Sequence, residues 1–128
     1  MEKNKKSILI VEDDTALRKV LNDKLSNEGF VVFEAVDGEQ GLKLAKEKHP
    51  TLILLDIFMP IMDGITMLSK LRSSDAWGKH VSVFILSNSA DVQTVTKVSG
   101  LVGTTDFLIK SEWSLDALVK RIREHVNN

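Results

Sequence analysis

Five short apolar runs each lead into polar residues, and the types of these polar residues could support chemistry. The polar residues are Glu12-Asp13-Asp14 after the apolar run 8–11, Glu34 after the run 30–33, Asp56 after the run 52–55, Ser87 after the run 81–86 and Lys110 after the run 107–109. An ionised carboxylate is costly to remove from water unless another group compensates its charge. Asp56, which directly follows four apolar residues, therefore needs partners that balance its charge.

Carboxylates without histidine or cysteine beside them favour a hard cation, Mg²⁺ before zinc. Lysine is a compact point charge that suits a phosphoryl oxygen, and a serine hydroxyl can donate to another oxygen of the same group. A carboxylate in such a setting can itself be the nucleophile and form an aspartyl phosphate. The set Asp13, Asp56, Ser87 and Lys110 therefore predicts phosphoryl transfer to Asp56, with the metal and the lysine balancing its charge.

Each of these residues also has a purely structural interpretation. Asp56, which precedes Pro60 and Asp63-Gly64, could simply end a strand and begin a turn. An acidic group before a helix can complement the helix dipole, and this is the preferred interpretation of Asp14. Ser87 could be a turn residue and Lys110 a solvated one. The coincidence of Asp13, Asp56, Ser87 and Lys110 at the ends of four apolar runs favours the chemical interpretation.

The elements that position these residues follow from the hydrophobic pattern. Stretches of helical period separate the apolar runs and start near Asp14, Asp37, Asp63, Asp91 and Ser114. Alternating strands and helices predict an α/β domain with a parallel sheet. Continuous apolar runs are typical of strands that helices cover on both faces, as in an open, doubly wound sheet. In such a sheet the carboxyl ends of the strands form the ligand site.

Composition excludes several classes of protein. With 128 residues, the chain is expected to form a single domain over 1–128, with an ordered core of about 6–126. It has no cysteine, which excludes disulfides and thiolate chemistry, and its net charge of −1 gives no case for nucleic acid or a membrane surface. No apolar stretch approaches the length of a membrane span, so we expect a cytoplasmic protein. The histidines at 49, 80 and 125 are expected at the surface, and Trp77 in a loop.

The motifs ILIVEDD, LLDIFMPIMDG, FILS and DFLIK, in this order and spacing, resemble those of receiver domains of two-component response regulators. The resemblance covers about residues 6–126, and the combination of motifs is specific to that family. It implies a flavodoxin-like three-layer sandwich of five βα units, with a five-stranded parallel sheet in the order 2-1-3-4-5.

The resemblance also implies a role for each matching residue. Asp56 matches the phosphoacceptor, and Asp13 and, less directly, Glu12 match the acidic pair that holds Mg²⁺. The backbone carbonyl of Phe58 would be a further metal ligand. Lys110 matches the lysine that pairs with the phosphoryl oxygens.

Two further matches concern signalling. Ser87 matches the hydroxyl residue that contacts the phosphoryl group, and Phe107 occupies the aromatic switch position. The surface formed by the fourth helix, the fifth strand and the fifth helix would then change its affinity for a partner. Such a switch is a population shift, driven by the difference in free energy between two states.

The resemblance implies that a sensor histidine kinase or a histidine phosphotransfer protein donates the phosphoryl group. The domain would assist its own phosphorylation and dephosphorylation but would not be an enzyme with an external product. The downstream protein target is unknown, no direct contact with nucleic acid or membrane is expected, and a phosphorylation-dependent homodimer stays open. The chain ends without an output domain, so it is expected to be either a stand-alone receiver or the receiver of a longer protein.

Two alternatives have weaker support. One is a degenerate receiver that acts only as a protein-interaction module, against which the intact set of acidic, hydroxyl and lysine residues argues. The other is an aspartyl-phosphate hydrolase of the haloacid dehalogenase type, which places a second acid two residues after the nucleophile. Phe58 occupies that position here and disfavours the hydrolase.

The sequence departs from the family pattern at a few positions. Ser111 follows Lys110 where the family usually has proline, so we expect a trans bond or a rearranged loop there, because a cis bond before a residue other than proline costs about 2.5–4 kcal/mol. Asn88 replaces a small apolar residue. Phe58 and Ser89 occupy positions that tune phosphoryl lifetime, and the bulky Phe58 is expected to lengthen it.

Overall fold

The computed structural model describes residues 5–87, 106–109 and 114–126, with residues 87, 106, 107 and 109 described by their backbone alone. The strands of the described part are β1 (Ser7–Val11), β2 (Val31–Ala35), β3 (Leu52–Asp56), β4 (Ser82–Ser87) and β5 (Asp106–Ile109). They pair in parallel in one sheet, in the order β2-β1-β3-β4-β5. The parallel sheet predicted from the apolar runs is confirmed.

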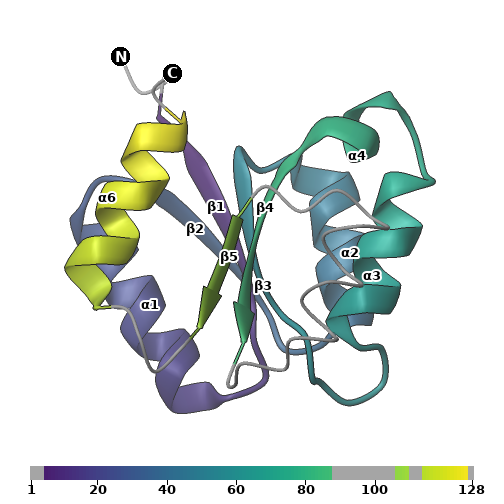
Figure 1. Ribbon diagram of the computed structural model, residues 1–128, viewed down its shortest axis with the longest axis horizontal. Coiled ribbons are helices and arrows are strands. Elements are labelled where there is room, and N and C mark those ends of the chain that lie inside the picture. Colours follow the sequence, from purple (N-terminus) through teal and green to yellow (C-terminus); the bar gives the residue numbers. More distant parts are fainter. Residues whose placement is uncertain (1–4, 88–105, 110–113, 127–128) are drawn as a thin grey trace.

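Helices cover both faces of this sheet. The helices of the described part are α1 (Thr15–Asn27), α2 (Gly38–Lys48), α3 (Gly64–Arg72), α4 (Ala76–His80) and α6 (Leu115–Val126). Figure 1 shows α1 and α6 on one side of the sheet and α2, α3 and α4 on the other. This arrangement is a three-layer, doubly wound α/β fold. The helix expected from about Asp91 lies outside the described residues.

A polar side chain starts each of these helices by accepting a hydrogen bond from a backbone N–H of the first turn. The caps are Asp14 (to Leu17, 3.1 Å), Asp37 (to Gln40, 2.8 Å), Asp63 (to Thr66, 2.7 Å), Asp75 (to Gly78, 2.7 Å) and Ser114 (to Ala117, 3.1 Å). Four of the five were predicted from the sequence as helix starts.

Strand β1 shows why the apolar runs are continuous. All four apolar residues of β1 after Ser7 are at most 1% exposed. Leu9 and Val11 pack into the cluster beneath α2 and α3, whereas Ile8 and Ile10 pack into the cluster beneath α1 and α6. Alternate side chains of a strand point to opposite faces, so a strand covered on both sides must be apolar at every position.

The segment after α3 differs from the prediction. Trp77 lies in the short helix α4 and is half-buried, not in a loop. The Asp75 cap starts this helix, and the guanidinium of Arg72 donates to the carbonyl oxygens of Gly78 (3.0 Å) and Val81 (2.8 Å). Arg72 thus joins the end of α3 to the middle of α4 and to the residue that follows it, a contact that the local sequence pattern does not reveal.

Candidate functional site

The strand order reverses between β1 and β3, because β2 lies on one side of β1 and the later strands lie on the other. In an open parallel sheet, ligands bind beyond the carboxyl ends of the strands at such a reversal. The acidic residues at the ends of these two strands therefore lie where the fold itself provides a site.

Glu12 and Asp13 directly follow β1. The N–H of Glu12 donates to the carbonyl oxygen of Ala35 (3.0 Å), which extends the pairing of β1 with β2 by one residue. The side chain of Glu12 is buried, and its Oε2 accepts from the N–H of Asp14 (3.1 Å). Asp13 is exposed. At the end of β1, Glu12 therefore lies on the buried side and Asp13 on the side that faces solvent.

Asp56 is the last residue of β3 and is only 6% exposed. Its Oδ1 accepts from the N–H of Ile57 (2.8 Å), which fixes the orientation of the carboxylate. The N–H of Gly64 donates to the carbonyl oxygen of Ile57 (2.7 Å) and holds the start of α3 against the end of the strand. Asp56 is thus held by backbone contacts on a rigid element.

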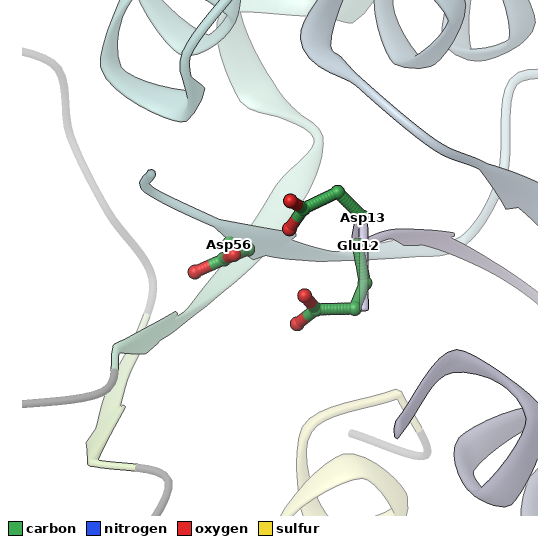
Figure 2. Close-up of side chains that lie close together, drawn as sticks. All are labelled: Glu12, Asp13 and Asp56. Atoms are coloured by element: carbon green, nitrogen blue, oxygen red, sulfur yellow. The ribbon is translucent and has the colours of Figure 1, made fainter. Parts of the chain in front are cut away.

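These three carboxylates lie together. One oxygen of each of Glu12, Asp13 and Asp56 lies within 4.8 Å of the others (Figure 2). Like charges so close repel one another, and a cation among them relieves the repulsion. A set of carboxylate oxygens without nitrogen or sulfur fits Mg²⁺, which usually takes one or two carboxylates and keeps its other positions for water or phosphate.

The loop between β3 and α3 borders this cluster. Phe58 is 60% exposed and Ile61 is 77% exposed. Ile61 has a φ of 70°, and the N–H of Met62 donates to the carbonyl oxygen of Pro60 (2.7 Å) across it, so a tight γ-turn is centred on Ile61. A left-handed backbone is unusual for a β-branched residue. No pattern in the sequence pointed to Ile61.

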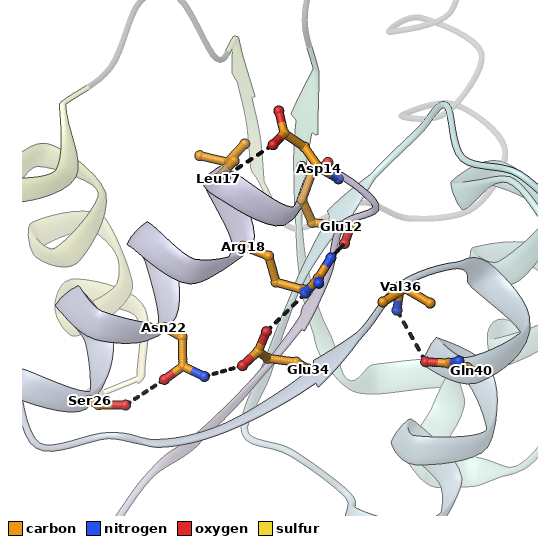
Figure 3. Close-up of polar contacts among 9 residues, drawn as sticks. All are labelled: Glu12, Asp14, Leu17, Arg18, Asn22, Ser26, Glu34, Val36 and Gln40. Atoms are coloured by element: carbon orange, nitrogen blue, oxygen red, sulfur yellow. Dashed lines mark hydrogen bonds and ion pairs between the residues drawn. The ribbon is translucent and has the colours of Figure 1, made fainter.

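A second contact network reaches the cluster from α1 (Figure 3). Nη1 of Arg18 donates to the carbonyl oxygen of Glu12 (2.8 Å), and Nε of Arg18 donates to Oε1 of Glu34 (2.9 Å). Glu34 was predicted to lie at a strand end, but no sequence pattern connects it with Arg18. Only the packing of α1 on the sheet brings these two residues together.

The remaining predicted site residues are described in part or lie outside the described residues. Ser87 and Phe107 are described by their backbone, in β4 and β5, and the register pairs Ser87 with Ile109. The predictions that fall outside the described residues concern Lys110, Ser111 and the bond between them, Asn88 and Ser89.

The histidines lie apart from the acidic cluster. His49 and His80 are exposed, as predicted, and His49 stacks on Trp77 with ring centroids 4.1 Å apart. His125 differs from the prediction of a surface position: it is half-buried, because its Nε2 contacts Oγ of Ser82 (2.5 Å) and its ring packs edge-on against Phe84. None of the helices in the described part is long and apolar enough to span a membrane.

Comparison with known families agrees with this geometry. The family model of the response regulator receiver domain matches residues 8–123. The chain belongs to this family, which acts in two-component signal transduction, and the prediction from the motifs is confirmed. Receiver domains of this family are generally signalling modules without enzymatic activity.

Individual relatives give the same result. The chain is 38% identical over 117 residues to the transcriptional regulatory protein PrrA of Mycobacterium tuberculosis, covering 91% of this chain and 48% of the relative. It is 33% identical over 131 residues to "Probable transcriptional regulator ycf27" of Cyanophora paradoxa, covering all of this chain and 52% of that protein. The chain thus spans about half the length of these curated relatives.

The fold also matches solved structures. A CheY-like receiver domain protein from Methanospirillum hungatei superposes with a TM-score of 0.87 at 26% identity, covering 97% of this chain and 95% of that one. The flavodoxin-like α/β class predicted from the sequence is therefore confirmed.

Proposed function

We propose that this domain is a phosphorylation-dependent switch in which Asp56 accepts a phosphoryl group from a sensor histidine kinase or a histidine phosphotransfer protein. The observation that carries the proposal is the cluster of Glu12, Asp13 and Asp56 at the reversal point of the sheet. A buried carboxylate on a rigid strand end, with two further acids within 4.8 Å, is an arrangement suited to metal-assisted phosphoryl transfer.

The proposed ligands of Mg²⁺ are the carboxylates of Glu12, Asp13 and Asp56 and the backbone carbonyl of Phe58. When bound, Mg²⁺ would neutralise charge on the phosphoryl oxygens. The chemistry of the donor set supports this choice, because it offers only hard oxygen ligands.

In the proposed reaction, a carboxylate oxygen of Asp56 attacks the phosphorus of a phosphohistidine. The phosphorus–nitrogen bond breaks, and its electron pair stays on the imidazole nitrogen, which then takes a proton from water. The product is an acyl phosphate on Asp56, which water later hydrolyses. The N–H of Ile57 keeps the attacking carboxylate aligned throughout. The domain assists these steps on itself and has no external product.

Ser87 and Lys110 are proposed to contact the phosphoryl oxygens. The backbone register supports this, because Asp56 pairs with Leu86, one residue before Ser87, and Ser87 pairs with Ile109, one residue before Lys110. In the proposed switch, Ser87 moves toward the phosphoryl group and the ring of Phe107 turns inward.

The signal is proposed to leave through the surface that contains β5, α6 and the helix expected from about Asp91. Its target is a protein, and phosphorylation-dependent homodimerisation is one form that this contact can take. The curated relatives are transcriptional regulators of about twice this length. We propose that a longer regulator containing this domain would contact DNA through another part of its chain. Response regulators are usually cytoplasmic, and that location stays a prediction for this chain.

The test is the intact mass of the protein after incubation with Mg²⁺ and a small acyl-phosphate donor. We expect a gain of one phosphoryl group that requires both Mg²⁺ and Asp56, so Asp56→Asn should gain none. Asp63→Asn is the matched control, because Asp63 lies in the same segment but caps α3, and asparagine can replace it as a cap. It should be phosphorylated as the wild type is.

Two results would contradict the proposal. One is a phosphoryl group that still appears on Asp56→Asn. The other is a wild type that gains none from the small donor and none from a phosphorylated histidine kinase. The second result would favour the degenerate interaction module, which no observation on the described residues favours at present.

A further inference from the structure

Arg18 is a largely buried cation at the start of a helix, beside the acidic cluster. It lies in the first turn of α1, where the helix dipole disfavours a cation, and its Nη1 is 2.8 Å from the carbonyl oxygen of Glu12, next to the acidic cluster. A positive charge there also repels a divalent cation bound by the cluster. Its side chain is nevertheless only 14% exposed, so it is held in place and does not extend into solvent.

Contacts along one side of α1 hold the guanidinium. Glu34, on β2, accepts from Nε of Arg18 at 2.9 Å and also accepts from the side-chain amide of Asn22. Asn22 in turn accepts from the hydroxyl of Ser26 (2.8 Å) (Figure 3). Glu34 compensates the charge of Arg18 and so lowers its repulsion of a nearby cation. What remains is the directional hydrogen bond from Arg18 to Glu12.

That hydrogen bond acts on the peptide unit between two of the acids. The carbonyl of Glu12 and the N–H of Asp13 belong to one planar group, so fixing the direction of the carbonyl fixes the rotation of the link between the two residues. The N–H of Glu12 is already bonded to Ala35. Arg18 therefore restricts the orientation of the peptide plane between Glu12 and Asp13, in addition to the restriction set by the bond to Ala35.

We propose that Arg18, oriented by Glu34, is a positioning residue for the divalent-cation site, because it fixes the peptide between Glu12 and Asp13. The proposal rests on the proposed function, in which these acids bind Mg²⁺. Arg18 acts through the backbone of its neighbours and does not touch the cation or the phosphoryl group.

The sign of one mutational effect separates positioning from simple charge. If Arg18 acted only as a charge, Arg18→Met would strengthen Mg²⁺ binding, because it removes a repulsive cation. If Arg18 acts by positioning, Arg18→Met weakens binding, and so does Arg18→Lys, because an ammonium cannot reproduce two donors in a fixed fork. Arg18→Lys also keeps the positive charge, which makes it the second variant should the methionine variant fold poorly.

The measurement is the dissociation constant of Mg²⁺, from shifts of backbone amide resonances in an NMR titration of the 128-residue protein, with the melting temperature recorded without metal. We expect both Arg18 variants to bind Mg²⁺ about tenfold more weakly, the lower end of the range for residues that orient metal ligands. Arg72→Met is the matched control, because Arg72 also donates to two backbone carbonyls but joins α3 to the α4 segment. It should lower the melting temperature and leave the Mg²⁺ affinity unchanged.

The outcomes are distinct. If the wild type binds Mg²⁺ and Arg18→Met binds it equally well or more tightly, the positioning role is wrong and the proposed function stands. The conclusion is the same if the two Arg18 variants and Arg72→Met all lose melting temperature equally and none of them changes its affinity for Mg²⁺. If the wild type itself binds no Mg²⁺, the metal-dependent function fails and the inference fails with it.

Discussion

At the scale of single residues, the loop after β3 is predicted to control how water reaches Asp56. Asp56 itself is buried, whereas Phe58, two residues later, is 60% exposed. A phosphoryl group on Asp56 would extend from the end of β3 toward this loop. We expect the bulky apolar side chain of Phe58 to hinder the approach of the water molecule that would hydrolyse the proposed acyl phosphate.

We therefore predict that Phe58→Asn shortens the lifetime of the phosphoryl group several-fold, because the smaller polar side chain admits and orients water. The decay of the phosphorylated mass over time measures this. Ile61→Asn is the matched control in the same loop, since Ile61 is even more exposed but lies five residues from Asp56. A Phe58→Asn variant that loses the phosphoryl group no faster than the wild type and Ile61→Asn would contradict the prediction.

At the scale of elements, the site depends on the close approach of α3 to β3. A Cβ atom on Gly64 would lie 2.1 Å from the carbonyl oxygen of Asp56 and 3.0 Å from Cα of Ile57. Both of these are backbone atoms, which no rotamer change can move. The absence of a side chain at Gly64 therefore allows α3 to start directly against the residue that carries the proposed phosphoacceptor.

Gly64→Ala is predicted to lower the free energy of unfolding by about 3 kcal/mol, because helix or strand must shift to relieve the overlap. Urea unfolding measures the change. Gly29→Ala is the comparison, because a Cβ atom on Gly29 would meet no other atom within 4 Å. Gly29 has a φ of 96°, so its replacement should cost only backbone strain, about 1–2 kcal/mol of the free energy of unfolding. Equal losses for the two variants would contradict the steric argument.

At the scale of the whole molecule, charged pairs link α1 and α6 across the outside of one layer. Arg123 donates to the carboxylate of Glu28 (2.8 Å), and Lys24 lies 2.7 Å from the carboxylate of Asp116. The hydrogen bond from Arg123 holds the pKa of Glu28 below its ordinary value, and the hydrogen bond from Lys24 does the same for Asp116. These residues couple the stability of the chain to pH.

The sign of that coupling follows from the lowered pKa values. A carboxyl group whose pKa is lower in the folded state contributes stability at neutral pH. That contribution is lost as the pH falls through the folded-state pKa, which for Glu28 lies below the ordinary value of 4.5. Arg123→Met should therefore be less stable than the wild type at neutral pH and approach it in acid. Urea unfolding between neutral pH and about pH 3 measures the difference.

The control for this prediction is Lys43→Met, which removes a cation from the exposed face of α2, in the other layer. Its stability should differ from that of the wild type by an amount that does not change over the acid range. High salt should reduce the effect of Arg123→Met, because exposed pairs are screened. Parallel pH curves for Arg123→Met and the wild type would contradict the assigned role of Glu28.

Much of the fold followed from local patterns. Continuous apolar runs predicted the strands, because a strand covered on both faces excludes water at every position. Asp63 was predicted to start a helix because a short carboxylate can accept from the free N–H groups of the first turn. The helix α4 was missed, because five residues are too few to establish a helical period.

By itself, the sequence determined the family, the parallel α/β class and the acidic residues of the candidate site, since these depend on residue types, their order and their spacing. Only the tertiary structure decided the distances among Glu12, Asp13 and Asp56 and the contact of Arg18 with Glu12. The physical reason is that strand register and helix packing bring together residues far apart in the chain. A contact between two residues far apart in the chain depends on how the whole core packs. Such a contact therefore leaves no local pattern in the sequence.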